Sequence, residues 1–131
     1  LGARYHVGIT ASTDSFYVGQ ERPGYRDYLP SFQKGLINLL KQVNVLNFEM
    51  EAATIFTLAS IYGLRAGAIC AAVANRETEE FIVDAGVEDA IRVANEAVRI
   101  LDTWDKKKEE KNKKTVIPEI IYEWFMEYMK R

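Results

Sequence analysis

The sequence predicts an α/β fold in which a mainly parallel or mixed sheet is flanked by helices. Strand-like and helix-like segments alternate along residues 5–101, and this alternation is typical of layered α/β domains. The chain has 131 residues, of which 48% are apolar, which is enough for one modest domain with a core. Because ligands of such sheets bind beyond the carboxyl ends of the strands, we expect functional residues to follow each strand.

The first half of the chain contains two predicted strands and two predicted helices. Residues 5–11 alternate and are rich in strand formers, so they predict a strand that enters a polar loop. Apolar residues at helical spacing predict a helix over residues 32–43. The apolar run 45–48 predicts a short strand, and residues 51–62 predict a nearly all-round apolar, buried helix that ends at Gly63.

The second half of the predicted domain adds one strand and one helix. Residues 65–74 (RAGAICAAVA) are small and apolar, and their place between two helices predicts a buried parallel strand. Cys70 lies in this run, so we interpret it as a small packed thiol and not as a nucleophile. Apolar residues along one face predict a long helix over residues 87–101. We expect residues 1–104 to form one domain.

The last part of the chain differs in composition from the rest. Residues 105–117 begin with the run DKKKEEKNKK and predict a charged, solvated linker. Residues 118–131 predict an amphipathic helical tail. Its apolar face comprises Ile120, Ile121, Trp124, Phe125, Tyr128 and Met129. We expect this face to pack on the chain's own body or a neighbouring subunit, because its largely acidic polar side disfavours a membrane surface.

Composition and motifs exclude several function classes. A net charge of −2 gives no electrostatic case for nucleic-acid binding. The apolar runs are far shorter than the roughly 20 residues of a membrane span, and no secretory leader is evident, so we expect a cytoplasmic protein. We find no metal-ligand cluster, glycine-rich phosphate loop or nucleophile–base pair, and therefore expect no metal. His6 is the single histidine, and we interpret it as a core residue of the first predicted strand and not as a catalytic base.

The loop after the first predicted strand carries one candidate binding site. Phe16, Gln20 and Arg22 combine an aromatic face, an amide and a guanidinium. These groups suit a planar polar heterocycle, because the amide can pair with an adjacent carbonyl and ring N–H. The alternative is a solvated loop in which Arg22 pairs with Glu21 or Asp27.

Two further candidates follow the other predicted strands. Glu49 and Glu51 lie between a strand and an apolar helix, where Glu51 would clamp the vicinal hydroxyls of a sugar or either carboxylate would cap the helix. Arg76 follows the strand predicted over residues 65–74. It points into the same cleft as Arg22, or it forms a surface ion pair with the acidic residues that follow it.

These motifs together resemble a known family. The run YHVGITASTDSFY at residues 5–17, the element GQER at residues 19–22 and Glu49-Met50-Glu51 resemble uridine phosphorylases of the nucleoside phosphorylase superfamily, over about residues 3–103. GQER is the specific part, because it resembles the insertion with which uridine phosphorylases recognise uracil. The resemblance implies a partial nucleoside-phosphorylase fold, namely the carboxyl-terminal portion of that domain.

The resemblance also implies a role for each matching residue. The uracil side is implied to comprise Phe16, Gln20, Arg22 and Arg76. The ribose side is implied to comprise Phe48, Glu49, Met50 and Glu51, with Phe48 standing where many relatives have tyrosine. Arg76 and Glu51 are implied to be catalytic.

The family's reaction is the reversible phosphorolysis of uridine to uracil and ribose 1-phosphate, with phosphate as co-substrate and no other cofactor. Family members are homohexamers. The family's amino-terminal half, which carries the phosphate site, is absent from this sequence, so we expect base and ribose contacts without turnover by this chain alone. The alternatives are a nucleoside phosphorylase or nucleosidase of other specificity, and a non-catalytic nucleoside-binding or oligomerisation module.

Overall fold

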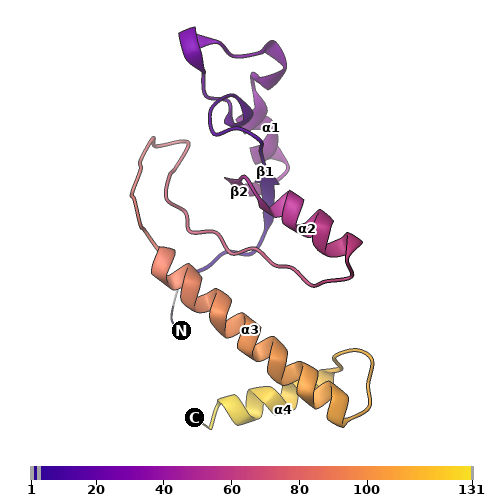
Figure 1. Ribbon diagram of the computed structural model, residues 1–131. Helices are drawn as coiled ribbons and strands as arrows, with labels where there is room; N and C mark the ends of the chain where they lie inside the picture. The colour runs from indigo at the N-terminus through magenta and orange to yellow at the C-terminus, as the bar shows by residue number, and fades with distance from the viewer. Residues whose placement is uncertain (1, 3, 131) are drawn as a thin grey trace.

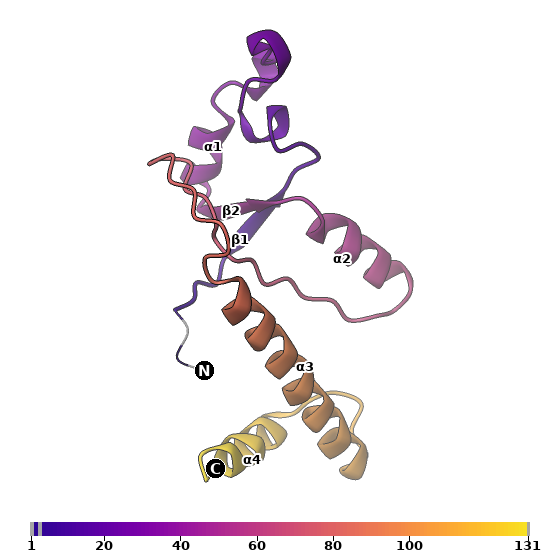
Figure 2. The same cartoon turned by 60° about the vertical axis from the view of Figure 1, so that its left-hand side comes forward.

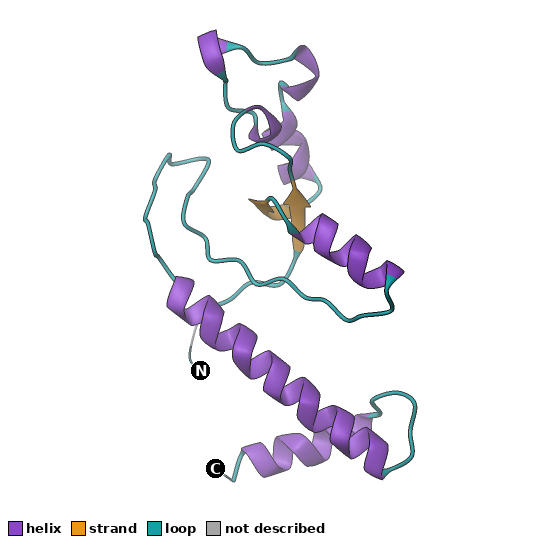
Figure 3. Cartoon of the chain, in the orientation of Figure 1, coloured by secondary structure: helices purple, strands orange, loops and turns teal. Residues whose placement is uncertain are grey.

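A computed structural model describes residue 2 and residues 4–130, and it shows helices around a small sheet (Figures 1 and 3). The regular elements are β1 (Ile9–Ser12), α1 (Leu36–Gln42), β2 (Val45–Glu49), α2 (Ala52–Ile61), α3 (Val87–Glu110) and α4 (Pro118–Tyr128). Three short 3-10 helices, η1 (Val18–Gln20), η2 (Tyr25–Asp27) and η3 (Ser31–Gln33), occupy the segment between β1 and α1. The expected α/β class is confirmed.

The sheet consists of β1 and β2, which pair in parallel with Ile9 opposite Val45 and Ser12 opposite Glu49. Just beyond the strand ends, the Thr13 N–H donates to the Glu49 carbonyl at 2.9 Å. Because the strands are parallel, the polar segments that follow them leave from the same edge of the sheet. β1 is shorter than predicted, so His6 precedes the strand and is exposed, which corrects its interpretation as a core residue.

The strand predicted over residues 65–74 is wrong. These residues form no strand, and their one β-bridge is antiparallel, between Ala74 and Phe81. Alanine and glycine have low strand propensity, and within the described residues no neighbouring strand pairs with residues 65–73 to hold their backbone extended. Cys70 is therefore exposed and not packed.

The molecule is open, and both views show elements that spread apart (Figures 1 and 2). A folded monomer of 14.9 kDa exposes about 7,000 Å², whereas this chain exposes 10687 Å². The predicted burial of the helix over residues 51–62 is wrong for the isolated chain, since Ile55 and Phe56 of α2 are 52% and 44% exposed. The composition of α2 is typical of a buried helix, but the described residues supply no second layer to cover it.

Helix α3 continues through the first part of the predicted linker, because residues 105–110 are helical. Lysine and glutamate are good helix formers, and two side-chain pairs one turn apart stabilise this stretch. Lys106 Nζ lies 2.7 Å from Asp102 Oδ2, and Lys108 Nζ lies 2.9 Å from Asp105 Oδ1. The irregular connection to α4 therefore starts only after Glu110. The division into domains stays a prediction.

Helix α4 docks against the carboxyl-terminal half of α3, as both ribbon views show (Figures 1 and 2). Trp124 meets Trp104 edge to face, with ring centroids 5.8 Å apart. Lys107 of α3 and Lys111, the residue after α3, pair with the carboxylates of Glu127 and Glu123 respectively, each at 2.9 Å. The polar side of α4 thus faces α3 in part.

The predicted apolar face of α4 is therefore only partly covered: one part contacts α3 and the other is exposed to solvent. Ile120 is fully buried, whereas Ile121, Phe125 and Met129 are 42%, 49% and 67% exposed. The two lysine–glutamate contacts lie on the side of α4 that faces α3, so only part of the apolar face reaches α3.

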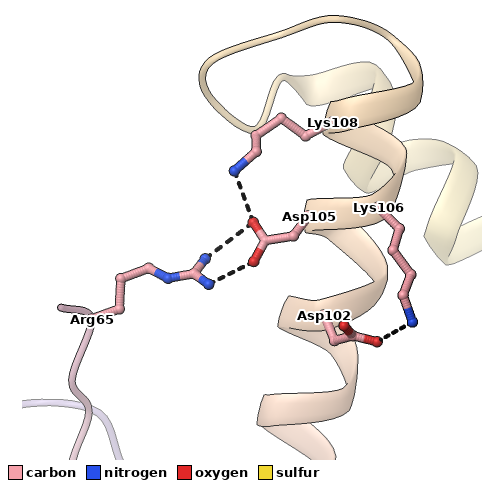
Figure 4. Close-up of polar contacts among 5 residues, drawn as sticks. All are labelled: Arg65, Asp102, Asp105, Lys106 and Lys108. Carbon is pink, nitrogen blue, oxygen red and sulfur yellow. Dashed lines mark hydrogen bonds and ion pairs between the residues drawn. The ribbon is translucent and has the colours of Figure 1, made fainter.

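An ion-pair cluster holds the start of the irregular segment after α2 against α3 (Figure 4). Arg65 donates from its two terminal nitrogens to the two carboxylate oxygens of Asp105, at 3.2 and 2.5 Å. Lys108 donates to the same carboxylate. These hydrogen bonds, led by that from Arg65, lower the pKa of Asp105 from 3.8 to about 2.

This cluster predicts a pH-dependent contribution to stability. Because the folded-state pKa of Asp105 is depressed, its contribution is present above pH 3.8 and is lost as pH falls toward 2. We expect Asp105→Asn to lower the urea midpoint of unfolding at pH 7, and the difference from wild type to close between about pH 4 and pH 2. Circular dichroism measures both midpoints, and a difference that stays constant over this range would contradict the prediction.

Candidate functional site

Gln20 is the centre of a cluster that the loop after β1 forms. Its side chain is only 6% exposed, although it lies in a polar loop. The amide nitrogen donates to Thr13 Oγ1 at 3.3 Å, and the amide oxygen accepts from Arg22 Nη1 at 3.0 Å. Both ends of the amide are thus fixed by neighbours, which holds the group in one orientation.

Gly19 allows the loop to close this tightly. A Cβ atom at this position would lie 3.0 Å from Asp14 Oδ1 and 3.3 Å from the Ser15 Cβ. Any other residue would require these neighbouring side chains to shift by a few tenths of an ångström.

Arg22 lies over the ring of Phe16, with its Cζ 4.2 Å from the ring centroid. It also donates to the Phe16 carbonyl at 3.2 Å. Burial, followed by the positive charge of Arg76, lowers the pKa of Arg22. The alternative pairing of Arg22 with Glu21 or Asp27 is absent from the ion pairs of residues 4–130. The aromatic contact is therefore preferred to a surface ion pair.

Arg76 reaches this cluster from the irregular segment before α3. Its Nη2 donates to the carbonyl oxygens of Gln20 at 3.0 Å and Glu21 at 3.5 Å. The expected surface ion pair with the following acids is not observed within the described residues, and Glu77 pairs with Lys41. Arg76 Nε is buried without a hydrogen-bond partner in that part of the chain.

A hollow of about 210 Å³ lies beside the two arginines. Its walls are formed by Arg22, Ala74, Asn75, Arg76, Glu79, Glu80 and Phe81. Positive and negative side chains both line this hollow, so it suits a polar ligand better than an apolar one.

The carboxylate of Glu49 has a structural role. The Ser12 hydroxyl donates to it, and so do the backbone N–H groups of Glu51 at 2.8 Å and Ala52 at 2.5 Å. The pKa of Glu49 is lowered, first by the Ser12 hydroxyl and then by these N–H groups. The Glu49 carboxylate thus caps the start of α2, as the helix-cap alternative expects.

Phe48 lies near the carboxyl end of β2, and Met50 and Glu51 follow the strand at the same edge of the sheet. Phe48 is half-buried, Met50 is 40% exposed and Glu51 is exposed. The structure thus joins Phe16, Gln20, Arg22 and Arg76 by direct contacts. For Glu51 it records no side-chain hydrogen bond to this cluster within the described residues. Thr13, bonded to both Gln20 and Glu49, links the two groups.

A family model described as the phosphorylase superfamily matches residues 1–103. The chain belongs to the phosphorylase superfamily. Among curated relatives in this superfamily, the chain is 59% identical to a uridine phosphorylase of Thermococcus kodakarensis over 118 residues. It is 39% identical to the uridine phosphorylase of Haemophilus influenzae over 107 residues, and 42% identical to that of Escherichia coli over 81. No solved structure matches the chain.

The chain spans less than half the length of these phosphorylase-superfamily relatives. The alignments cover 90%, 76% and 61% of this chain, but 42%, 42% and 32% of the respective relatives. Because the 118 residues aligned with the Thermococcus protein exceed the length of residues 1–104, the match reaches into the segment beyond residue 104. This segment therefore has a counterpart in at least one relative.

Glu21 and Asn75 shape the candidate site, and neither is among the binding residues expected from the sequence. The Glu21 carboxylate accepts from the backbone N–H groups of Gly35 at 2.6 Å and Ile37 at 2.7 Å. Asn75 accepts from the N–H groups of Glu77 and Thr78 and shapes the turn beside Arg76. The Asn75 turn has a local signal, because asparagine commonly bonds the backbone two residues on. The contacts of Glu21 join it to residues 14 and 16 positions later, so no local sequence signal indicates them.

Among the residues that the structure describes, no group of His, Cys, Asp and Glu side chains is arranged to hold a metal ion. Within the same residues, none of the helices combines the length and apolar character needed to cross a membrane.

Proposed function

We propose that this chain carries the base- and ribose-binding residues of a uridine phosphorylase, a pentosyltransferase of pyrimidine salvage. The reaction is the reversible phosphorolysis of uridine to uracil and ribose 1-phosphate. One observation carries the proposal: the buried Gln20 accepts a hydrogen bond at 3.0 Å from Arg22 on its side-chain amide oxygen and another at 3.0 Å from Arg76, more than 50 residues away, on its backbone carbonyl. The 59% identity to the Thermococcus uridine phosphorylase supports it.

The cluster suits the chemistry of uracil. Beyond its bonds to Thr13 and Arg22, the Gln20 amide has a second N–H donor and a second acceptor lone pair, which match an adjacent carbonyl and ring N–H. Arg22 supplies a further donor. Its positive charge stabilises the negative charge that uracil acquires as the glycosidic bond breaks. Phe16, 43% exposed, forms a wall for the planar ring. Arg76 holds the loop backbone through the Gln20 carbonyl and adds a second positive charge.

We assign the ribose to residues at and just after the carboxyl end of β2. The exposed Glu51 carboxylate would accept from two vicinal hydroxyls, and Met50 and Phe48 would contact the sugar. Glu49 acts differently, because its oxygens already accept from the start of α2. It therefore positions Glu51. Arg76 and Glu51 are the residues proposed to take part in catalysis, and phosphate is the co-substrate, with no metal required.

We propose that a polypeptide segment or subunit outside this chain completes the site. Apolar side chains of α2 and α4 are exposed in this chain. Exposed apolar patches of this kind typically become buried against a neighbouring segment or subunit. That polypeptide would supply the phosphate ligands, and a homo-oligomer in the cytoplasm would be the working form. Neither nucleic acid nor a membrane is a proposed partner.

Titration calorimetry tests the proposed function. We expect uracil and uridine to bind this chain and adenine to bind at least about tenfold more weakly, because adenine has no carbonyl oxygen to accept from Gln20 and Arg22 and presents an amino donor in place of one. We expect no release of uracil when the chain alone is mixed with uridine and phosphate. Equal binding of adenine would indicate another nucleoside specificity, and efficient turnover would overturn the proposed division of the site.

A second candidate is a non-catalytic, oligomer-forming module. The exposed apolar side of α4 favours it, because Ile121, Phe125 and Met129 remain uncovered. Such a module should bind neither uracil nor uridine, so the same calorimetry separates the two functions.

A further inference from the structure

We propose that Glu21 is a positioning residue, which sets the base-recognition loop, residues 16–22, by docking it onto the amino-terminal end of α1. This inference rests on the proposed function, because the loop matters only if Gln20 and Arg22 recognise a base. Glu21 itself would not touch the substrate.

The Glu21 carboxylate uses both of its oxygens for this docking. Oε1 accepts from the Gly35 N–H at 2.6 Å, and Oε2 accepts from the Ile37 N–H at 2.7 Å. These are charge-assisted hydrogen bonds to N–H groups that the first turn of a helix leaves without intrahelical partners. The two N–H groups lower the pKa of Glu21, which keeps the carboxylate ionised at neutral pH.

The backbone at Glu21 shows that the docking shapes the loop. Glu21 has a φ of 55°, in the left-handed region that glutamate rarely adopts. Its N–H closes η1 by donating to the Val18 carbonyl, and the next N–H, that of Arg22, donates to the Tyr17 carbonyl at 2.8 Å. This conformation brings the side chains of Gln20 and Arg22 together. The strain persists because contacts on both sides of Glu21 hold it.

Arg76 contacts the opposite side of the same residue. Its Nη2 donates to the carbonyl oxygens of Gln20 and Glu21. The loop is therefore held between two clamps, one from α1 through the Glu21 carboxylate and one from Arg76 through the backbone. Releasing the α1 clamp leaves only the Arg76 clamp to hold the loop.

Gly35 completes the docking from the α1 side. It is the amino-terminal cap of α1, with φ 85° and ψ 4°. A Cβ atom there would meet nothing within 4 Å, so alanine would add only backbone strain. Gly86 is the matched position, because it caps α3 with φ 73° and ψ 6° and also has open space around its Cβ.

The test compares Glu21→Gln, Gly35→Ala and Gly86→Ala in this chain. Glutamine keeps the shape of Glu21 but loses the charge and one acceptor. We expect Glu21→Gln and Gly35→Ala to weaken uracil binding about tenfold in calorimetry. Both should also speed amide hydrogen exchange of residues 20–22, measured by mass spectrometry. Gly86→Ala should change neither quantity, although it adds similar backbone strain.

The outcomes separate this inference from the proposed function. If wild type does not bind uracil, the proposed function fails, and the exchange rates alone decide whether Glu21 orders the loop. If wild type binds uracil and Glu21→Gln binds equally well with unchanged exchange, Glu21 only caps α1 and the inference is wrong. It is also wrong if Gly86→Ala affects the loop as much as Gly35→Ala does.

Discussion

Replacing Gln20 by leucine is expected to weaken uracil binding about 100-fold, which corresponds to about 2.7 kcal/mol. Leucine has a similar size, so the buried site stays filled, but the donor and the acceptor for the base are both lost. Each hydrogen bond contributes about 1 to 1.5 kcal/mol, and a base that enters the site would lose its water without gaining partners. Thr13 and Arg22 would also lose the amide that they contact.

Titration calorimetry with uracil measures the effect. Gln42→Leu is the control, because Gln42 is an exposed glutamine at the end of α1 and outside the cluster. We expect the control to bind as wild type does. An affinity of Gln20→Leu within about threefold of wild type would show that Gln20 does not recognise the base.

The second large effect is expected at Ile120, the fully buried side chain of α4. Ile120→Ala should destabilise the docking of α4 on α3 by about 2 to 5 kcal/mol, because it leaves a cavity where the helices meet. α4 has 11 residues, and a helix of that length is marginal in water without tertiary contacts. The variant should therefore lose α4 as a helix at temperatures where wild type keeps it.

Tryptophan fluorescence follows this docking directly. The two tryptophans of the chain, Trp104 and Trp124, contact each other across the α3–α4 junction. Ile121→Ala is the matched control, because Ile121 is the next residue and is 42% exposed. We expect the control to cost less than about 1 kcal/mol. Equal shifts of the thermal midpoint for the two variants would contradict the assignment of Ile120 as the anchor.

Much of the base side of the candidate site could be predicted from the sequence. Phe16, Gln20 and Arg22 lie within seven residues, so local chemistry was enough to select them. Arg76 was selected for its position after a predicted strand, and it does reach the loop, although the strand itself is absent. The cap that Glu49 forms at the start of α2 is visible only in the three-dimensional contacts.

The secondary structure was likewise predicted correctly where the signal is local and incorrectly where it depends on distant contacts. Helices α1, α2 and α4 lie within the predicted ranges, and strand β2 exceeds its predicted range by one residue, because their apolar spacing is a local signal. The segment 65–74 failed because a strand depends on a neighbour to pair with, and its small side chains carry no signal of whether one is present. α3 exceeded its prediction because charged residues one turn apart stabilise a helix as well as they solvate a linker.

The sequence by itself determined the α/β class, the superfamily and the residue types of the base site, because these are properties of short motifs and of apolar periodicity. Only the tertiary structure decided that Glu21 docks on α1, that Arg76 clamps the Gln20 backbone, and that α4 buries Ile120 while Ile121 stays in solvent. Each of these contacts joins segments far apart in the chain. Which distant groups meet depends on how the elements pack, and that information is not present in any local stretch of residues.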